Sequence, residues 1–240
     1  MTLKRTVKAL SLVFLLSCVA AVPAFSEEYV YGTLTGDLID FVDISEEVPD
    51  DSPALYGKPS LMGGHNIYFP TNFSSSTEGE NGANVLEGTL RMTLQAHDGF
   101  AITRVTVTEF GNYEFNGSAG SSATHVTHQA SLTVGELTTG YDSTLSHGDI
   151  AYTQGNTSGN FTTSASLDFS GLGMTSLDFE LVNILSTYSQ DGTTATLSKR
   201  IVNNTPQVEI YYAPIPIPGA VWLMVSGLMA VAGFSHRKRR

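Results

Sequence analysis

Apolar and polar side chains alternate along most of the chain between residues 27 and 213. The clearest example is Leu86–Ala96, in which the even positions are apolar or small and the odd positions are polar. Successive side chains of a β-strand point to opposite faces, so this period of two predicts a strand with one buried face. The same pattern predicts further strands at Tyr29–Leu34, Leu38–Val42, His65–Phe69, Phe100–Glu109, Tyr113–Asn116, Val126–Val134, Phe161–Phe169, Ser176–Leu181, Ala195–Val202 and Gln207–Tyr212.

Turn-forming residues separate these strands. Clusters such as Asp98-Gly99, Gly155–Asn160 and Asp191-Gly192 interrupt the alternation at short intervals. Many short strands joined by such turns predict an all-β fold, namely a single antiparallel β-sandwich of jelly-roll type. Residues 45–51 are predicted to form a short helix or a loop, and the prolines at 49 and 53 favour the loop.

Residues 214–240 depart from this pattern. The proline-rich stretch Pro214–Gly219 precedes an uncharged apolar run, which is followed by four consecutive cations at the end of the chain. Residues 219–235 reach the short limit for a helix that crosses a bilayer, and cations hold their end of such a helix in the cytoplasm. We therefore expect one C-terminal transmembrane helix. The alternative is an apolar core helix, but such a helix shows a polar face and this segment has none.

Three elements of this tail occur in the same order in a known kind of sorting signal. They are Ile215–Gly219, the run Ala220–Leu223 with Ser226–Leu228 behind it, and the basic end. The tail therefore resembles the C-terminal sorting signal of bacterial exosortase substrates, the PEP-CTERM group and especially its VPLPA-type variant. It differs by Ile in place of Val and Leu and by Gly219 where Ala is commoner.

The resemblance implies a role for each part of the tail. An exosortase-type membrane protease would recognise the proline motif and process the tail of an exported protein of a Gram-negative bacterium. The implied sorting motif is Pro214, Pro216, Pro218 and Gly219. The implied membrane span includes Ala220, Trp222, Gly227 and Phe234, and the implied cytoplasmic anchor is Arg237, Lys238, Arg239 and Arg240.

The other end of the chain has the features of a signal peptide. Lys4, Arg5 and Lys8 precede the apolar stretch Ala9–Ala21, and small residues follow at the position for cleavage by signal peptidase. We expect a signal peptide at 1–26, a β-sandwich domain at 27–213 and a sorting tail at 214–240. The single cysteine, Cys18, lies in the signal peptide, so the mature chain has no disulfide and no thiol ligand or nucleophile. A lipoprotein signal ending at Cys18 is the alternative.

The central region is strongly acidic. It holds all 23 acidic residues and only five cations, a formal charge of −18. Such a domain repels nucleic acid, so we exclude DNA and RNA as partners. It attracts divalent cations, and the carboxylates between Asp37 and Asp51 are the best candidates for one structural calcium ion. A solvated acidic surface without calcium is the favoured alternative, so no cofactor is assigned and the metal site stays unknown.

No motif of a catalytic site is present, and we do not expect an enzyme. His125 and His128 are three residues apart on a strand, so they point to opposite faces and cannot share one metal ion. His128 is predicted to face the core and His125 the solvent. Tyr211 and Tyr212 are also on opposite faces, so at least one is expected to pack inward.

Three functions follow as hypotheses. The first is an exported protein of the inner membrane and then of the cell surface or extracellular matrix, with a structural or adhesive role. The second is a carbohydrate-binding module that acts on exopolysaccharide, with or without calcium, through exposed tyrosines. The third is a hydrolase with two carboxylates in a deep cleft.

Overall fold

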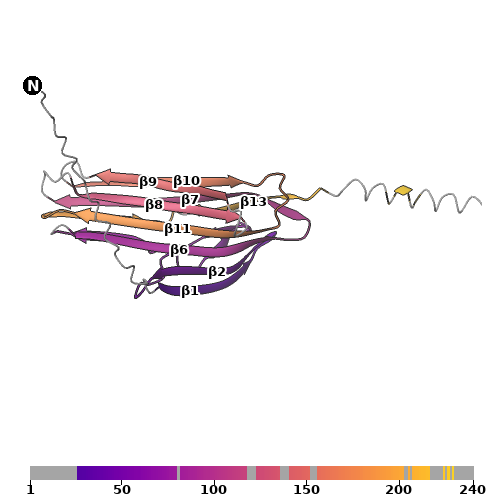
Figure 1. Cartoon of the computed structure of the whole chain (residues 1–240), viewed down its shortest axis with the longest axis horizontal. Coiled ribbons are helices and arrows are strands. Elements are labelled where there is room, and N and C mark those ends of the chain that lie inside the picture. Colours follow the sequence, from indigo (N-terminus) through magenta and orange to yellow (C-terminus); the bar gives the residue numbers. More distant parts are fainter. Residues whose placement is uncertain are drawn as a thin grey trace, which may run out of the picture.

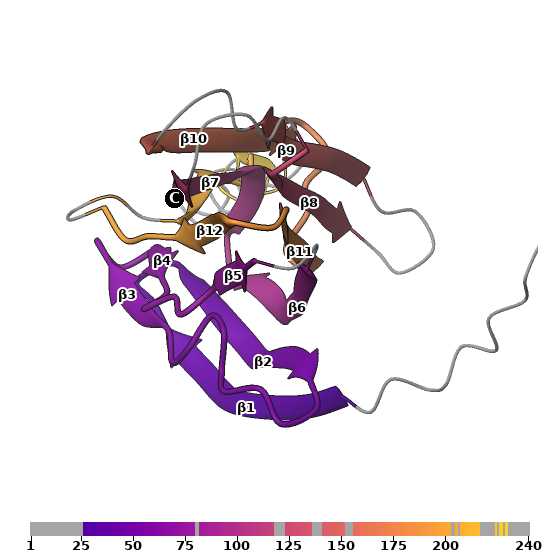
Figure 2. The ribbon, with the colours of Figure 1, turned by 90° about the vertical axis from the view of Figure 1, so that its left-hand side faces the viewer.

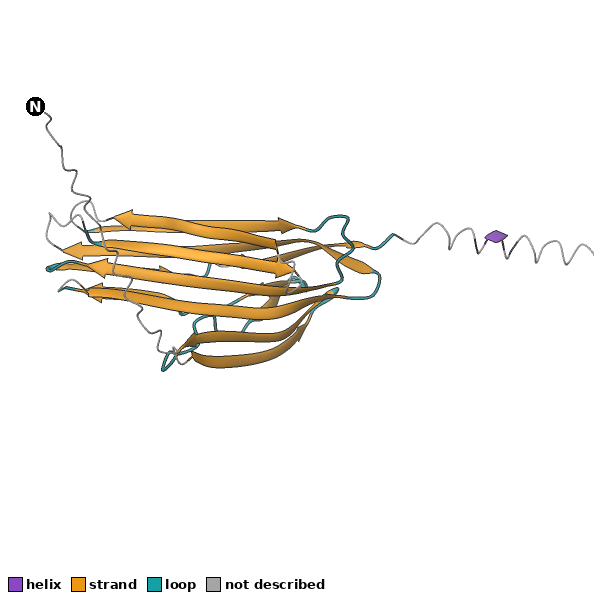
Figure 3. Ribbon diagram, in the orientation of Figure 1, coloured by secondary structure: helices purple, strands orange, loops and turns teal. Residues whose placement is uncertain are grey.

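Most of the described part of the chain is β-strand (Figure 3). The structure is a computed structural model that describes residues 26–79, 82–117, 123–135, 141–151, 156–202, 205 and 207–216, together with 224, 226, 227 and 229. Thirteen strands run through these residues: β1 (Ser26–Thr35), β2 (Ile39–Pro49), β3 (Ser60–Met62), β4 (Asn66–Tyr68), β5 (Ser74–Glu78), β6 (Gly82–Ala96), β7 (Phe100–Gly117), β8 (His125–Gly135), β9 (Tyr141–Ala151), β10 (Thr157–Asp168), β11 (Ser176–Ser189), β12 (Thr193–Lys199) and β13 (Val208–Pro214).

The strands form two antiparallel sheets that run along the long axis of the molecule (Figure 1). The first sheet has the order β1-β2-β6-β11-β8-β9, and the second has the order β3-β4-β13-β7-β12-β5. The long strand β7 pairs with β13 near its start and with β12 near its end, while β10 pairs with its other edge. On one side of the sandwich, β9 of the first sheet lies beside β10 of the second (Figure 2).

The space between the sheets is filled by the apolar half of each alternating strand. Phe41, Leu90 and Phe179 of the first sheet are at most 2 % exposed, as are Val107 and Phe115 of the second. Each such side chain stabilises the fold by about 1.5–3 kcal/mol relative to an exposed position. The core is one continuous cluster of these residues. The prediction of an antiparallel β-sandwich is therefore confirmed, and the alternation in Leu86–Ala96 marks the buried face of β6.

The prediction of a helix or loop at residues 45–51 is wrong. β2 extends to Pro49 and pairs with β1 along this segment. The pairing of β2 with β6 shifts register between Val42 and Ser45, where Asp43 adopts a φ of 53°. Such a bulge puts the alternation out of phase, so the sequence no longer shows a continuous period of two. Pro49 is tolerated because it is the last residue of the strand.

Three strands, β3, β5 and β9, were not predicted from the sequence, and β3 has only three residues, too few to show a period of two. β5 has the sequence Ser-Ser-Ser-Thr-Glu and therefore no apolar face, although Ser75 is fully buried. β9 includes the stretch from Asp142 to Asp149, which was interpreted as an acidic loop. All three strands form because a neighbouring strand offers a row of backbone donors and acceptors, β4 for β3, β12 for β5 and β8 for β9.

The structure describes only part of the predicted sorting tail. Pro214 is the last residue of β13 and pairs with Phe100, Pro216 lies in the loop that follows, and Gly227 is helical. Residues 1–25, which include most of the predicted signal peptide, lie outside the described residues, as do Pro218, Gly219, Ala220, Trp222, Phe234, Arg237, Lys238, Arg239 and Arg240. Among the residues that are described, no helix is long and apolar enough to cross a membrane.

Candidate functional site

The outer face of β7 and β10 carries mostly hydroxyl and amide side chains. From Arg104 onward in β7, and throughout β10, alternation places the even-numbered residues on this face, while most odd-numbered ones pack into the sandwich. The two strands pair in register, so that Thr106 lies opposite Ser166 and Thr108 opposite Ser164. Their hydroxyl oxygens are 2.9 and 3.1 Å apart. These hydrogen bonds hold the side chains in fixed positions and leave lone pairs for an external ligand.

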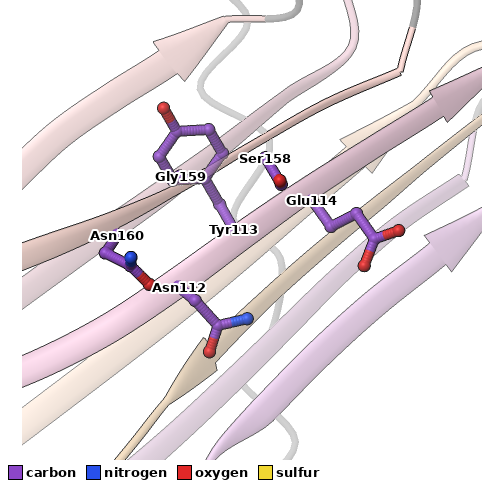
Figure 4. Close-up of a pocket in the computed structure, with 6 residues that line it drawn as sticks. All are labelled: Asn112, Tyr113, Glu114, Ser158, Gly159 and Asn160. Carbon is purple, nitrogen blue, oxygen red and sulfur yellow. The ribbon is translucent and has the colours of Figure 1, made fainter.

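A hollow of about 340 Å³ lies at one end of this face (Figure 4). Asn112 and Glu114 of β7 line it, opposite Asn160 and Ser158 of β10. The Tyr113 ring points to the other side of β7 from Asn112 and Glu114 (Figure 4). We name these four polar residues, 112, 114, 158 and 160, the polar hollow.

Gly159 makes room for this arrangement. It is the register partner of Tyr113, and a Cβ atom at this position would lie 2.4 Å from the Tyr113 hydroxyl. Any side chain here would therefore displace the Tyr113 ring. Glu114 is held by Asn116, whose Nδ2 donates to Glu114 Oε1 over 2.9 Å. Together the hollow offers two carboxamides, a carboxylate and a hydroxyl, which can donate to and accept from neighbouring hydroxyl groups of a ligand.

An aromatic side chain stands at the other end of the same outer face. Tyr211 of β13 is 41 % exposed and pairs with Arg104 of β7. The guanidinium carbon of Arg104 lies 3.9 Å from the centre of the Tyr211 ring. Tyr212 lies on the other side of a register shift and is packed against the core. The prediction that at least one of these two tyrosines packs inward is confirmed.

A second polar site is buried between the two sheets. Glu109 of β7 and Lys199 of β12 point inward from the second sheet, and His128 of β8 and Asn183 of β11 point inward from the first. Glu109 Oε1 accepts hydrogen bonds from Lys199 Nζ over 2.5 Å and from Asn183 Nδ2 over 2.8 Å. His128 Nε2 lies 3.1 Å from both Glu109 Oε2 and Asn183 Oδ1. We name Glu109, His128, Asn183 and Lys199 the buried cluster.

Aromatic rings enclose the buried cluster. Asn183 Nδ2 also donates to the hydroxyl of Tyr56, which in turn donates to the carbonyl of Leu181. The Lys199 ammonium lies 5.0 Å from the Tyr56 ring centre and 4.9 Å from that of Phe73, within the range of a cation–π contact. All four members of the cluster are at most 8 % exposed. Water is thus largely excluded from the ion pair.

The charges in the cluster are set by these contacts. Burial alone would raise the pKa of Glu109, but the charge of Lys199 and the hydrogen bond from His128 outweigh it and lower the pKa to about 2. His128 Nε2 faces two acceptors, while its buried Nδ1 has no hydrogen-bond partner in the described structure. A proton on Nε2 and none on Nδ1 satisfies this geometry, so we assign the neutral Nε2–H tautomer.

A second buried carboxylate positions the loop that carries Tyr56. Glu46 of β2 is fully buried, and its carboxylate accepts the backbone N–H groups of Leu55, Tyr56 and Gly57 over 2.7, 2.7 and 3.1 Å. Burial raises the pKa of Glu46, while these hydrogen bonds oppose the rise. The loop would otherwise bury three donors without partners. Glu46 therefore fixes Tyr56 where it can contact Asn183 and Lys199.

The residues singled out in the sequence are dispersed in the structure. His128 is buried, as predicted, and His125 lies on the opposite face of β8, where its ring stacks on Tyr188. Within the part of the chain that the structure describes, no three His, Cys, Asp or Glu side chains are grouped closely enough to hold a metal ion. One of the carboxylates proposed for calcium, Glu46, instead binds backbone N–H groups in the interior.

No protein-family model matches the sequence, and no curated protein matches it significantly. Several solved structures show a distant similarity of fold. TmCBM61 in complex with β-1,4-galactotriose is 9 % identical over 70 % of this chain and 82 % of its own, with a TM-score of 0.25. Carbohydrate-binding modules from the β-sandwich superfamily give 9 % identity over 79 % and 87 %, with a TM-score of 0.21.

The similarity extends to an enzyme as well. The enzymatically active domain of tailspike protein 4 of bacteriophage CBA120 is 11 % identical over 79 % of this chain but only 19 % of its own, with a TM-score of 0.22. The two sheets of this chain themselves define its class, the two-sheet antiparallel β-sandwich. At these scores the comparisons carry no argument about what this chain binds.

Proposed function

We propose that this chain is an exported adhesive protein that binds extracellular polysaccharide through the outer face of β7 and β10. The polar hollow is the observation that supports this proposal. It brings together amide, carboxylate and hydroxyl groups from two paired strands (Figure 4). A polysaccharide presents many hydroxyl groups that both donate and accept, and such side chains can bind them with direct or water-mediated hydrogen bonds.

The shape and charge of this face define the class of ligand. The face is open and follows two long strands, so an extended chain can lie along it and reach from the polar hollow towards Tyr211. An exposed tyrosine ring offers an apolar surface with a polar tip, which suits the face of a sugar ring. The central region has a formal charge of −18, which repels polyanions. We therefore propose a neutral polysaccharide.

The double variant Asn112→Ala/Asn160→Ala is expected to lose most of its affinity for such a polysaccharide. Two neutral hydrogen bonds of about 0.5–1.5 kcal/mol each, one for each asparagine, correspond to a loss of roughly 5- to 150-fold. Affinity electrophoresis in gels that contain neutral exopolysaccharides would measure it. The matched control is Gln129→Ala/Ser131→Ala on the exposed face of β8 in the first sheet, which should bind like the unchanged protein. An equal loss of affinity in both variants, or no binding by the unchanged protein, would rule out the outer face of β7 and β10 as the polysaccharide-binding site.

The tail supports the proposed route to the cell surface. Its order of proline motif, apolar run and basic end fits a stay in the inner membrane and processing by an exosortase-type protease, after signal peptidase has removed residues 1–26 of the exported chain. On this proposal, Pro216→Ala/Pro218→Ala blocks processing but leaves membrane insertion intact, because the apolar run is unchanged. Immunoblotting of membrane and medium fractions should then show the protein only in the membrane. The control Pro206→Ala, outside the motif, should be processed normally, and normal processing of the double variant would refute the assignment.

A further inference from the structure

Glu109 stands between an amine and a carboxamide that come from opposite sheets. Its Oε1 atom accepts hydrogen bonds from Lys199 Nζ over 2.5 Å and from Asn183 Nδ2 over 2.8 Å, so both nitrogens contact the same oxygen. An amine, a carboxamide and a carboxyl group that can move protons between them are the components of an amide-exchange reaction. We propose that Lys199 and Asn183 form a covalent isopeptide bond across the sandwich, with Glu109 and His128 as the catalytic residues.

The interior of the sandwich prepares Lys199 to react. In water a lysine amine is protonated and not nucleophilic, but a buried Lys⁺–Glu⁻ pair can become a neutral pair by one proton transfer along their hydrogen bond. Lys199 and Glu109 are 8 and 2 % exposed, and the Tyr56 and Phe73 rings flank the amine. Low polarity favours the neutral pair more than bulk water does. In the proposed reaction the first step is this transfer of a proton from the resting ion pair to Glu109, which leaves Lys199 with a free electron pair for the attack.

His128 activates the carboxamide. Its Nε2–H lies 3.1 Å from Asn183 Oδ1, the oxygen on which negative charge develops when an amine attacks the carbonyl carbon. A hydrogen-bond donor fixed at this position stabilises the tetrahedral intermediate. The ring is held in place by Phe161, whose centre lies 5.1 Å from that of His128. Gly111 makes room for Phe161, since a Cβ atom there would lie 2.1 Å from its Cζ.

The reaction balances without an external reagent. Lys199 Nζ attacks Asn183 Cγ, forms the new C–N bond and gives up a proton. The bond from Cγ to Nδ2 breaks, and Nδ2 takes up that proton and leaves as ammonia. Glu109 accepts and donates protons between the two nitrogens, and ends protonated because the cation beside it has become a neutral amide. The products are one isopeptide bond and one ammonia molecule, with no net change of charge.

The bond would replace a buried ion pair by a neutral amide and join the two sheets. Asn183 belongs to β11 of the first sheet and Lys199 to β12 of the second. A covalent link restricts the unfolded chain and so stabilises the folded one, as a disulfide does. The central region contains no cysteine and is predicted to work outside the cell, where this kind of link would be useful. The inference rests on the buried cluster alone and is independent of polysaccharide binding.

Intact mass spectrometry of the folded full chain tests the proposal, with both chain ends established by peptide mapping. The expected mass is lower than the calculated one by about 17 Da, the mass of ammonia. Fragmentation should identify one branched peptide that joins Asn183 to Lys199, and trypsin should no longer cleave after Lys199. A mass equal to the calculated value in the folded protein would overturn the proposal. A loss of ammonia located at an Asn-Gly pair, with linear peptides only, would overturn it as well.

Two variants separate the chemistry from the fold. Glu109→Gln keeps the size of the side chain but cannot relay protons, so the folded variant should have the full calculated mass. Glu87→Gln, an exposed position of β6, should show the same loss of ammonia as the unchanged protein. A Glu109→Gln variant that still forms the bond would exclude Glu109 as a catalytic residue. If Glu109→Gln does not fold, the mass of the unchanged protein still decides whether the bond forms.

Discussion

Replacing Glu109 by alanine will lower the free energy of unfolding by about 3–5 kcal/mol, the usual cost of breaking a buried ion pair. The change removes the carboxylate that accepts hydrogen bonds from Lys199, Asn183 and His128. It also leaves the Lys199 cation among apolar side chains. It also removes the residue on which the proposed isopeptide bond depends, so no cross-link would offset the loss. Denaturant unfolding followed by circular dichroism would measure the change.

A double variant provides the control for this prediction. In Glu109→Leu/Lys199→Met both charges are replaced by apolar groups, and such replacements of buried pairs are often neutral or stabilising. The double variant should therefore be more stable than Glu109→Ala, although it removes one side chain more. If Glu109→Ala unfolds at the same denaturant concentration as the unchanged protein, the buried cluster makes no contribution to stability.

Replacing Glu46 by alanine will have an effect of similar size for a different reason. The backbone N–H groups of Leu55, Tyr56 and Gly57 would lose their acceptor inside the protein. A buried donor without a partner costs about 1–3 kcal/mol, so the loss of the acceptor of all three is expected to cost about 3–9 kcal/mol. For a domain of this size that lowers the melting temperature by roughly 10 °C or more, measurable by differential scanning calorimetry.

The neighbouring glutamate is a matched control. Glu47 forms an ion pair with Arg91 over 2.6 Å, but both side chains are more than one third exposed. Exposed pairs contribute between nothing and about 1 kcal/mol, so Glu47→Ala should shift the melting temperature only slightly. A large effect of Glu47→Ala together with a small effect of Glu46→Ala would contradict the assignment of Glu46 as the acceptor that holds the loop.

The fold could be predicted where one face of a strand is apolar. β6, β8 and β11 alternate clearly, and each was found from its sequence. β3, β5 and β9 could not be found in this way, because hydrogen bonds to a neighbouring strand hold them in place. A single bulge near Asp43 was enough to hide the second half of β2. Backbone pairing and bulges depend on which strands are adjacent, and alternation alone does not give that information.

The buried cluster left a signal in the sequence, but only a partial one. Glu109, Asn183 and Lys199 each occupy an inward position of an alternating strand, and a charged or amide side chain at such a position requires a partner. Only His128 was predicted to face the core. The partners are 16 to 90 residues apart along the chain, and they meet because β7 and β12 face β8 and β11 across the sandwich. The polar hollow likewise depends on the register of β7 with β10.

The central claim is that the outer face of β7 and β10 binds a neutral polysaccharide. The most direct test is a titration of the isotope-labelled protein with fragments of a neutral exopolysaccharide, followed by backbone amide NMR signals. The account predicts that the signals that shift are those of Asn112, Glu114, Ser158 and Asn160 and their neighbours on the same face, with the signals of the first sheet unchanged. Shifts confined to the outer face of β8 and β11, or no shifts at saturating concentrations of every fragment, would contradict it.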